Sequence, residues 1–346
     1  MPDSSQLLFY LNELTSRSEG HPIETFILVH KESVEELADH LSELERNLLY
    51  EKTGPTIYKV DLRLRKRSVQ GWLDTRDDIW ILHIVEPRSP SAAESIADDW
   101  IAGVFPILSS TRVTYPQILD LLDDLAHVGR SLRIQDYVSR SFRWSAGRER
   151  WLRQTTKRWL KGAPYDRRTM ERNAESSKEL IDAIHFYYDA GEESFEAKIS
   201  RRGRFTYYRG GKNGFLNFRR LVVEPMISAV TQAREIYSNR EKHVEREYVT
   251  VKPIEYRFSR SLHPDPDFRK ISDVLGAQSE YTMSLVHSGN PYLALRLIDR
   301  DDGSSYDVYG FEKRLLVVPL DRATSDSLAR LDGYINEVFP DGAVSL

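Results

Sequence analysis

Residues 185–208 read HFYYDAGEESFEAKISRRGRFTYY, and this stretch decides the fold that we predict. Short segments containing Gly191 and Gly203 separate three aromatic-rich runs, at 185–188, 194–200 and 204–208. Strand-forming runs with brief Gly-containing connections are typical of antiparallel strands that follow one another in a sheet. The stretch therefore predicts a three-stranded meander.

A helix is predicted to follow this meander and to pack on it. We expect a fourth strand at 215–223 and then a helix at 225–242, because Pro225 suits the first turn of a helix. The same order recurs near the C-terminus, with strands at 281–286, 292–298, 305–309 and 314–319 and a helix at 325–338. The two copies share no sequence identity, so repeated sheet-plus-helix modules stay one alternative. Antiparallel sheets with packed helices predict an α+β protein with several domains.

The rest of the chain alternates predicted helices with predicted strands. Ser33-Val-Glu-Glu36 is a capping box, which begins a helix by satisfying its free backbone donors. Hydrophobic spacing predicts helices at 5–16, 33–50, 91–104, 145–160 and 169–184, another beginning at 114, and strands at 25–30, 58–67 and 79–85. We predict four segments: an acidic α+β domain at 1–129, a basic helical segment at 130–183, a basic α+β domain at 184–260 and a C-terminal α+β domain at 261–346.

Charge is strongly segregated along the chain, although the net charge is only −4. Residues 1–129 carry 12 Lys and Arg against 22 Asp and Glu, a balance of −10. Residues 130–260 carry 29 against 17, or +12, and residues 261–346 carry 8 against 14, or −6. A basic middle between acidic ends indicates an acidic or polyanionic partner.

Aromatic side chains alternate with the cations of this middle region. Cations neutralise phosphates and flat rings stack on bases, so the mixture is what a nucleic-acid surface requires. We predict phosphate contacts from Arg201, Arg202, Arg204, Arg209 and Lys212, with a second group at Arg150, Arg153, Arg158 and Lys161. Possible stacking residues are Tyr207, Tyr208 and Trp159. No base-reading motif is present, so we expect contacts to the backbone and shape of DNA or RNA within a larger assembly.

Other interpretations of the basic middle stay open. Its arginines could pair with the acids of the terminal segments, and its aromatic residues could be ordinary core or interface side chains. A scaffold or adaptor that docks an acidic protein is the alternative function. A basic helix at 145–160 could also lie on an anionic membrane, but its apolar stripe is thin, and we expect no membrane partner.

One short motif suggests catalysis. Asp189 followed by Glu196-Ala-Lys198 resembles the catalytic core of PD-(D/E)xK nucleases over residues 189–198. The resemblance implies that the two acids hold a divalent metal for phosphodiester cleavage beside the lysine. A Glu-x-Lys on a solvated strand is the alternative interpretation. A metal-dependent nuclease is therefore our second alternative, and we favour a protein that is not an enzyme.

The remaining features argue against other chemistry. The chain has no cysteine, which excludes disulfides, thiolate metal sites and cysteine nucleophiles. The acidic runs at 299–303 and 265–267 are better read as a turn and a helix cap than as metal loops, and the Gly-rich segment at 209–214 is a connecting turn or a phosphate contact, not a P-loop. The nine histidines show no metal spacing. We predict no cofactor, no metal, no secretory signal and a soluble cytoplasmic protein.

Overall fold

The chain folds into two compact units. The structure, a computed structural model, describes residues 4–17, 22–30, 33–41, 46–65, 67–75, 79–85, 96–104, 108–111, 113, 115–145, 150–177, 179–238, 242–245, 248–251, 253–263, 267–276, 281–288, 292–300, 303–320, 323, 325–339 and 343–345. Unit 1 comprises Met1–Arg140 and Thr155–Val230, and unit 2 comprises Ser141–Gln154 and Thr231–Leu346. Both contain helices and antiparallel sheet, which confirms the predicted α+β class. The four predicted segments stay a prediction.

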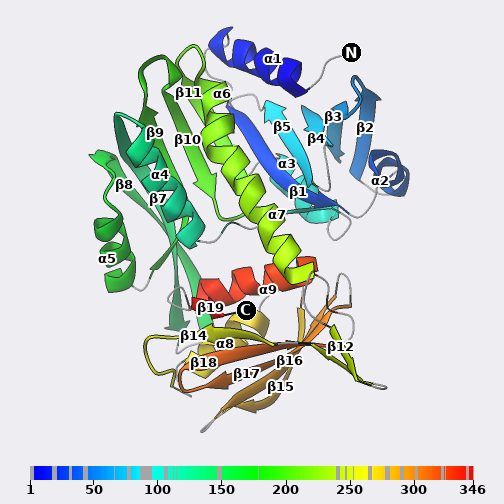
Figure 1. The fold of residues 1–346 in the computed structure, drawn as a ribbon, viewed down its shortest axis with the longest axis vertical. Helices are drawn as coiled ribbons and strands as arrows, with labels where there is room; N and C mark the ends of the chain where they lie inside the picture. The colour runs from blue at the N-terminus through cyan, green and yellow to red at the C-terminus, as the bar shows by residue number, and fades with distance from the viewer. Residues whose placement is uncertain are drawn as a thin grey trace. The chain divides into compact units, whose positions relative to one another are not determined.

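An 11-stranded sheet is the centre of unit 1 (Figure 1). Its order is β2-β3-β4-β5-β1-β11-β10-β9-β7-β8, and β6 also pairs with β1. The strands are β1 (Ile23–His30), β2 (Arg46–Lys52), β3 (Ile57–Leu64), β4 (Arg67–Asp74), β5 (Ile79–Val85), β6 (Leu108–Ser110), β7 (Ser131–Ser145), β8 (Arg150–Pro164), β9 (Glu179–Asp189), β10 (Phe195–Ser200) and β11 (Arg204–Gly210). The predicted meander is confirmed as β9, β10 and β11, which pair antiparallel in sequence order.

Strand β1 is buried on both faces. Ile23 and Ile27 belong to one hydrophobic core, the first core, whereas Phe26 and Leu28 belong to another on the opposite face, the second core. Successive side chains of a strand point to opposite faces, so this alternation assigns each core to one side of the sheet. The two edges of β1 are also occupied, by β5 on one side and by β11 and β6 in succession on the other.

Helices supply the other half of each core. The first core takes apolar side chains from α1 (Ser4–Arg17), α4 (Tyr115–Val128), α5 (Arg167–Ser177), α6 (Gly214–Phe218), the π-helical segment Arg219–Val223 and α7 (Glu224–Ser238). The second core takes them from α2 (Val34–Leu41) and α3 (Ile96–Val104). Figure 1 shows α4 and α6 across the same side of β7 to β11. The capping box is confirmed, because Ser33 N donates to Glu36 Oε2 at 2.8 Å and Glu36 N donates to Ser33 Oγ at 3.2 Å. The second predicted box, at 91–94, lies outside the described residues.

Four element predictions are wrong in whole or in part. The helix predicted at 145–160 is strand: β7 extends to Ser145 and β8 begins at Arg150. Its Trp and Thr residues share a helical spacing, but aromatic and β-branched side chains also favour strands, and pairing in the sheet decides between the two states. The helix predicted to reach residue 50 ends at Leu41, and β2 begins at Arg46.

The third wrong prediction is the strand at 215–223, which is helical. Phe215, Phe218 and Val222 are all fully buried in the first core. Their spacing of three and four residues places them on one helical face, a pattern that alternation alone does not reveal. The helix predicted at 169–184 is also shorter, because α5 ends at Ser177 and β9 begins at Glu179.

Unit 2 is built on a six-stranded sheet in the order β15-β16-β17-β18-β14-β19. Its strands are β14 (Ile254–Arg257), β15 (Tyr281–Ser288), β16 (Leu293–Asp299), β17 (Ser305–Phe311), β18 (Arg314–Pro319) and β19 (Ala343–Ser345), and β12 (Lys242–Glu245) pairs with β13 (Tyr248–Val251). Helices α8 (Arg269–Gly276) and α9 (Ser325–Val338) share its core with the sheet. The predicted C-terminal meander and its helix are therefore confirmed.

Both acidic runs of unit 2 have structural partners. Asp299 is fully buried and accepts hydrogen bonds from Ser327 Oγ at 2.5 Å and Arg330 Nη2 at 2.6 Å. Its backbone closes the turn before β17, because Gly303 N donates to Asp299 O at 3.0 Å. Asp267 accepts a bidentate pair from Arg260 at 2.8 and 3.0 Å. The predicted cap at Asp265 lies outside the described residues. Within the described chain no helix is long and apolar enough to cross a membrane.

Candidate functional site

Five polar side chains form a continuous line across five neighbouring strands of unit 1. We call this line the polar ladder; in spatial order it consists of Lys157 (β8), Asp136 (β7), His185 (β9), Glu196 (β10) and Arg209 (β11). Lys157 Nζ lies 3.4 Å from Asp136 Oδ1, and Asp136 Oδ2 lies 3.0 Å from His185 Nδ1. His185 Nε2 lies 2.9 Å from Glu196 Oε1, and Arg209 Nε donates to Glu196 Oε2 at 2.6 Å. Cationic and anionic groups thus alternate along the ladder.

The alternation of the strands places the ladder on the side of the sheet opposite the first core. Ile184 and Phe186 flank His185 and face the first core, as Ala197 does beside Glu196. A change of register between Glu196 and Ala197 marks a bulge opposite Tyr208, whose ring centroid lies 4.9 Å from that of His185. Bulges redirect side chains, and this one places Tyr208 against the ladder. We call this side of β7 to β11 the polar face.

The three inner members of the ladder are largely buried, whereas its two ends are exposed. The side chain of Asp136 is 2% exposed, that of Glu196 14% and that of His185 18%, whereas Lys157 is 44% and Arg209 78% exposed. Hydrogen bonds from His185 and Arg209 lower the pKa of Glu196 to about 2. Burial raises the pKa of Tyr208 to about 12. Both ring nitrogens of His185 face carboxylate oxygens, so the imidazole bridges Asp136 and Glu196.

Removing the imidazole is expected to destabilise unit 1. His185→Ala leaves buried Asp136 and half-buried Glu196 without their shared donor, so the free energy of unfolding should fall by roughly 2 kcal/mol at neutral pH. Urea denaturation of wild type and variant measures this difference. His127→Ala, at an exposed position in α4, is the control and should change little. A loss no larger than that of the control would show that the ladder contributes nothing to stability.

Lys198 lies beside the ladder but outside it. It pairs across the sheet with His185 on β9 and Thr206 on β11. Burial lowers its pKa, and the neighbouring cations Arg204 and Lys157 lower it further, while Asp136 and Asp182 act against them. Its ammonium forms no hydrogen bond or ion pair within the part of the chain that the structure describes. Lys198 is thus a half-buried cation held near other cations.

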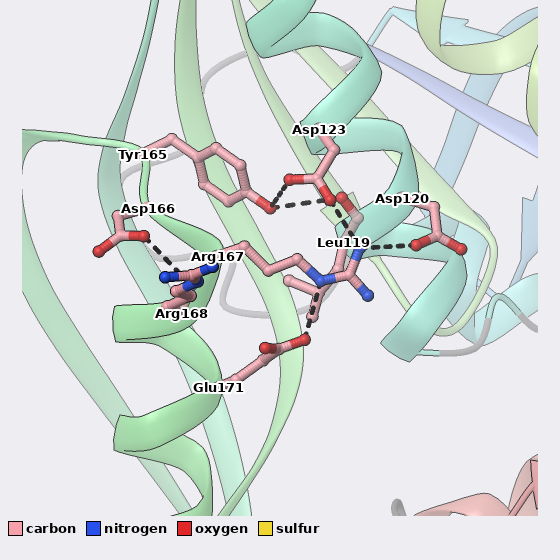
Figure 2. A network of polar contacts seen from close by, with 8 residues as sticks. All are labelled: Leu119, Asp120, Asp123, Tyr165, Asp166, Arg167, Arg168 and Glu171. Carbon is pink, nitrogen blue, oxygen red and sulfur yellow. Dashed lines mark hydrogen bonds and ion pairs between the residues drawn. The ribbon is translucent and has the colours of Figure 1, made fainter.

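The cations of the basic middle also pair with acids of the first 129 residues. Arg204 Nη1 contacts Asp98 of α3 closely and lies 3.7 Å from Glu24 of β1. Arg167 Nη1 donates to Asp120 at 2.8 Å and to Asp123 at 2.6 Å, both in α4, and its Nε donates to Glu171 at 2.8 Å (Figure 2). These contacts confirm part of the alternative interpretation, in which the basic middle complements the acidic segment.

The Arg167 cluster is expected to add modestly to stability. Tyr165 Oη donates to Asp123 Oδ1 at 2.8 Å and, at 3.3 Å, to Leu119 O, so the cluster joins α4 to the start of α5 (Figure 2). Arg167→Ala should lower the free energy of unfolding by only about 1 kcal/mol, because the side chains are partly exposed and water screens them. Thermal unfolding at 0.05 M and about 1 M salt tests this, since high salt should shrink the difference. A salt-independent loss would point to packing by the arginine stem instead.

The structure separates the predicted contact residues into three groups. Arg202, Arg209, Lys212, Arg158, Lys161 and Trp159 are exposed. Tyr208 and Arg204 are half-buried, with Arg204 paired as described above. Arg201 is 5% exposed and Tyr207 2%, with Tyr207 in the first core, so both are corrected from surface contacts to interior residues. The side chains of Arg150 and Arg153 lie outside the described part, and binding by the exposed residues stays a prediction.

The Gly-rich segment after β11 is a packed turn. Gly211 N donates to Ser194 O at 2.8 Å, and Asn213 N donates to Glu192 O at 3.3 Å, so these backbone donors are already used. A Cβ on Gly211 would lie 2.1 Å from Glu192 O, which explains the glycine by close approach of two backbones. Asn213 has a φ of −113°, so the turn uses no left-handed conformation at this residue.

The residues of the nuclease resemblance have different surroundings. Asp189 accepts hydrogen bonds from Gly191 N and Ser194 Oγ, both at 3.2 Å, and so shapes the β9–β10 turn. Glu196 is engaged by His185 and Arg209, while Lys198 lies on the same face of β10. Among the described residues, no group of three or more His, Asp and Glu side chains is arranged to hold a metal ion.

Sequence reasoning missed three members of the ladder: Asp136, His185 and Lys157. His185 was considered as one of nine histidines without metal spacing. Strict alternation would not have found Asp136, because Leu132 and Ile134, two and four positions before it, face the first core, and the segment around it was predicted as helical. No family model matches the chain, and no curated protein matches it.

Proposed function

We propose that this protein binds nucleic acid through the polar face and is not an enzyme. The observation that carries the proposal is the combination of two exposed cations, Lys157 and Arg209, at the ends of the ladder with the exposed ring of Trp159 on the same edge strand as Lys157. The acids of the ladder are only 2% and 14% exposed and pair with Lys157 and Arg209, so the exposed groups of the ladder are cationic. Cations beside an exposed aromatic ring suit phosphates and bases.

Contacts of this kind favour recognition of backbone and shape over base sequence. Lysine and arginine side chains that project from a sheet bind phosphates without reading base edges. Three further exposed cations, Lys161, Arg202 and Lys212, form no ion pair with described residues and would extend the contact. We further propose that the protein acts in the cytoplasm as part of a larger assembly.

Neutralising the ladder ends is expected to weaken binding and to reduce its salt dependence. For Lys157→Gln with Arg209→Gln, affinity for a labelled oligonucleotide should fall at least about fivefold, and the slope of log affinity against log salt should fall by about 2. Fluorescence anisotropy at several salt concentrations measures both quantities. Lys59→Gln with Arg63→Gln is the matched control, because both cations are exposed on β3 and Arg63 also pairs with a neighbouring carboxylate, at 2.9 Å from Asp61.

The alternative functions give different results in the same experiment. An adaptor that docks an acidic protein would ignore nucleic acid at every salt concentration and would co-purify with a protein. A metal-dependent nuclease would cleave the oligonucleotide in Mg²⁺ or Mn²⁺ and would fail on Glu196→Ala and on Lys198→Ala. Absence of binding at low salt would refute the proposal.

A further inference from the structure

We infer that the polymer bound by the polar face is single-stranded, with a base stacked on Trp159 and a phosphate held by Lys198. The inference rests on the proposed function and adds the strandedness of the ligand and the role of two residues. It follows from three observations. The Trp159 ring is exposed and held on one face, Lys198 forms no ion pair with a described residue, and both residues lie on the same sheet.

Trp159 is an exposed aromatic ring that is fixed in place. Its side chain is 65% exposed, whereas Trp80 and Trp100 are 3% and 1% exposed. Lys157 Nζ lies 3.8 Å from the centroid of the Trp159 ring and is itself paired with Asp136, so the ladder holds one face of the indole. A cation over one face leaves the other available to a second flat group.

A duplex offers no partner for such a ring. Its bases already stack on one another, and only their edges reach the grooves. Bases of a single strand can be splayed out and stacked on aromatic side chains, which is how sheet-based single-strand binders hold their ligands. An exposed indole on an open sheet edge therefore favours a single strand.

Lys198 supplies a cation that lacks a direct counterion. The charged groups that act on it include Arg204 and Lys157, which repel it, and Asp136 and Asp182, which attract it, but no described carboxylate forms an ion pair with it. Asp136 and Glu196 are engaged along the ladder. A phosphate oxygen at Lys198 would supply the direct ion pair that these carboxylates do not form. The strands β8 and β10 that carry the two residues are three steps apart in the sheet, or about 14 Å at ~4.8 Å per strand. A flexible strand can follow that distance across the face.

One binding assay tests both the strandedness of the ligand and the contributions of Trp159 and Lys198 to affinity. Anisotropy with a labelled 20-nucleotide single strand, as DNA and as RNA, is measured against the duplex of the same sequence for the full-length protein. The variants are Trp159→Ala, Trp159→Phe and Lys198→Gln. Phe9→Ala, which removes a 61% exposed ring from α1, and Lys59→Gln are the matched controls. Thermal unfolding of each variant checks that the fold is retained.

We expect single strands to bind at least about tenfold more tightly than the duplex. Trp159→Ala should weaken single-strand binding about tenfold and leave duplex binding unchanged, while Trp159→Phe should stay within about threefold of wild type because a ring is retained. Lys198→Gln should weaken binding about fivefold and lower the salt slope by about 1. Both controls should match wild type.

The inference and the proposed function fail in different ways. The inference is overturned if duplex and single strand bind equally, or if Trp159→Ala does not change single-strand binding. In either case, binding that weakens with salt would still support the proposed function. Lys198→Gln with wild-type affinity and salt slope overturns the assignment of the phosphate to Lys198. No binding to any of the oligonucleotides at low salt overturns both.

Discussion

Replacing Asp299 with alanine should lower the free energy of unfolding of unit 2 by about 3 to 5 kcal/mol. The carboxylate is fully buried, and its partner Arg330 is only 11% exposed. Removing one member of a buried ion pair leaves the other charge uncompensated. The resulting loss of stability is far larger than the net contribution of the intact pair to the free energy of unfolding. The substitution also removes the acceptor of the hydrogen bond donated by Ser327 Oγ, which is fully buried and bonds to the same oxygen.

Amide hydrogen exchange followed by mass spectrometry measures this effect where it arises. Peptides from β16, β17 and α9 should exchange much faster in Asp299→Ala than in wild type, and thermal unfolding should shift downward. Asp307→Ala is the control, because Asp307 pairs with Arg296 at 2.7 Å on the exposed side of the same sheet and its loss should cost less than about 1 kcal/mol. Equal effects of the two substitutions would contradict the assignment of Asp299 as a buried anchor.

A second large effect is expected at acid pH from His83. This imidazole is 1% exposed, and its Nδ1 lies 3.0 Å from Thr25 Oγ1. Burial, and then the nearby charge of Arg219, lower the pKa of His83 from its ordinary value of 6.5 to about 3. The unfolded chain thus takes up a proton at a pH where the folded chain does not. The contribution of His83 to the free energy of unfolding is therefore present in full above pH 6.5 and is lost as the pH falls toward 3.

The size of the loss follows from the difference in pKa. Between pH 7 and pH 5 the His83 contribution to the free energy of unfolding should fall by about 2 kcal/mol, at 1.36 kcal/mol per pH unit once the unfolded imidazole is protonated. His83→Asn keeps a polar group near Thr25 but cannot titrate in this range. The variant is expected to be less stable at pH 7 and to lose about 2 kcal/mol less than wild type on acidification.

Urea denaturation at pH 7 and pH 5 compares wild type with this variant. His287→Asn, at an exposed position on β15, is the control and should keep the wild-type pH dependence. If His83→Asn also keeps that dependence, the acid sensitivity arises from other groups.

Local patterns predicted those parts of the fold in which neighbouring segments pair. The β9–β11 and β15–β18 meanders join strands that follow one another along the chain, so alternation and turn residues suffice. The β7–β8 hairpin was missed because Trp151, Thr155 and Trp159 fit a helical face as well as a strand. The pairing of β8 with β7, and of β7 with β9, decides between the two.

The candidate site was harder to predict because its contacts are not local. Asp136 and His185 are separated by 49 positions, and Arg204 and Asp98 by 106. Composition identified the cations and aromatic residues of the middle region but not which of them are exposed, as Trp159 and Arg209 are. Tyr207 was misassigned because neighbouring residues of a strand face opposite sides. Arg201 was misassigned because it lies in the β10–β11 turn, where its backbone bonds to Asp182 and Val113 hold it in the interior.

The central position of β1 has a consequence for synthesis of the chain on the ribosome. Residues Ile23–Phe26 of β1 pair with Arg204–Tyr207 of β11, so this part of the strand edge stays unpaired until more than 200 residues have been made. Unpaired strand edges recruit other chains, and long-range pairing is slow. Nascent chains that end before β11 should therefore need protection from aggregation, and fragments truncated there should be insoluble, whereas chains that extend through α7 can complete the sheet of unit 1.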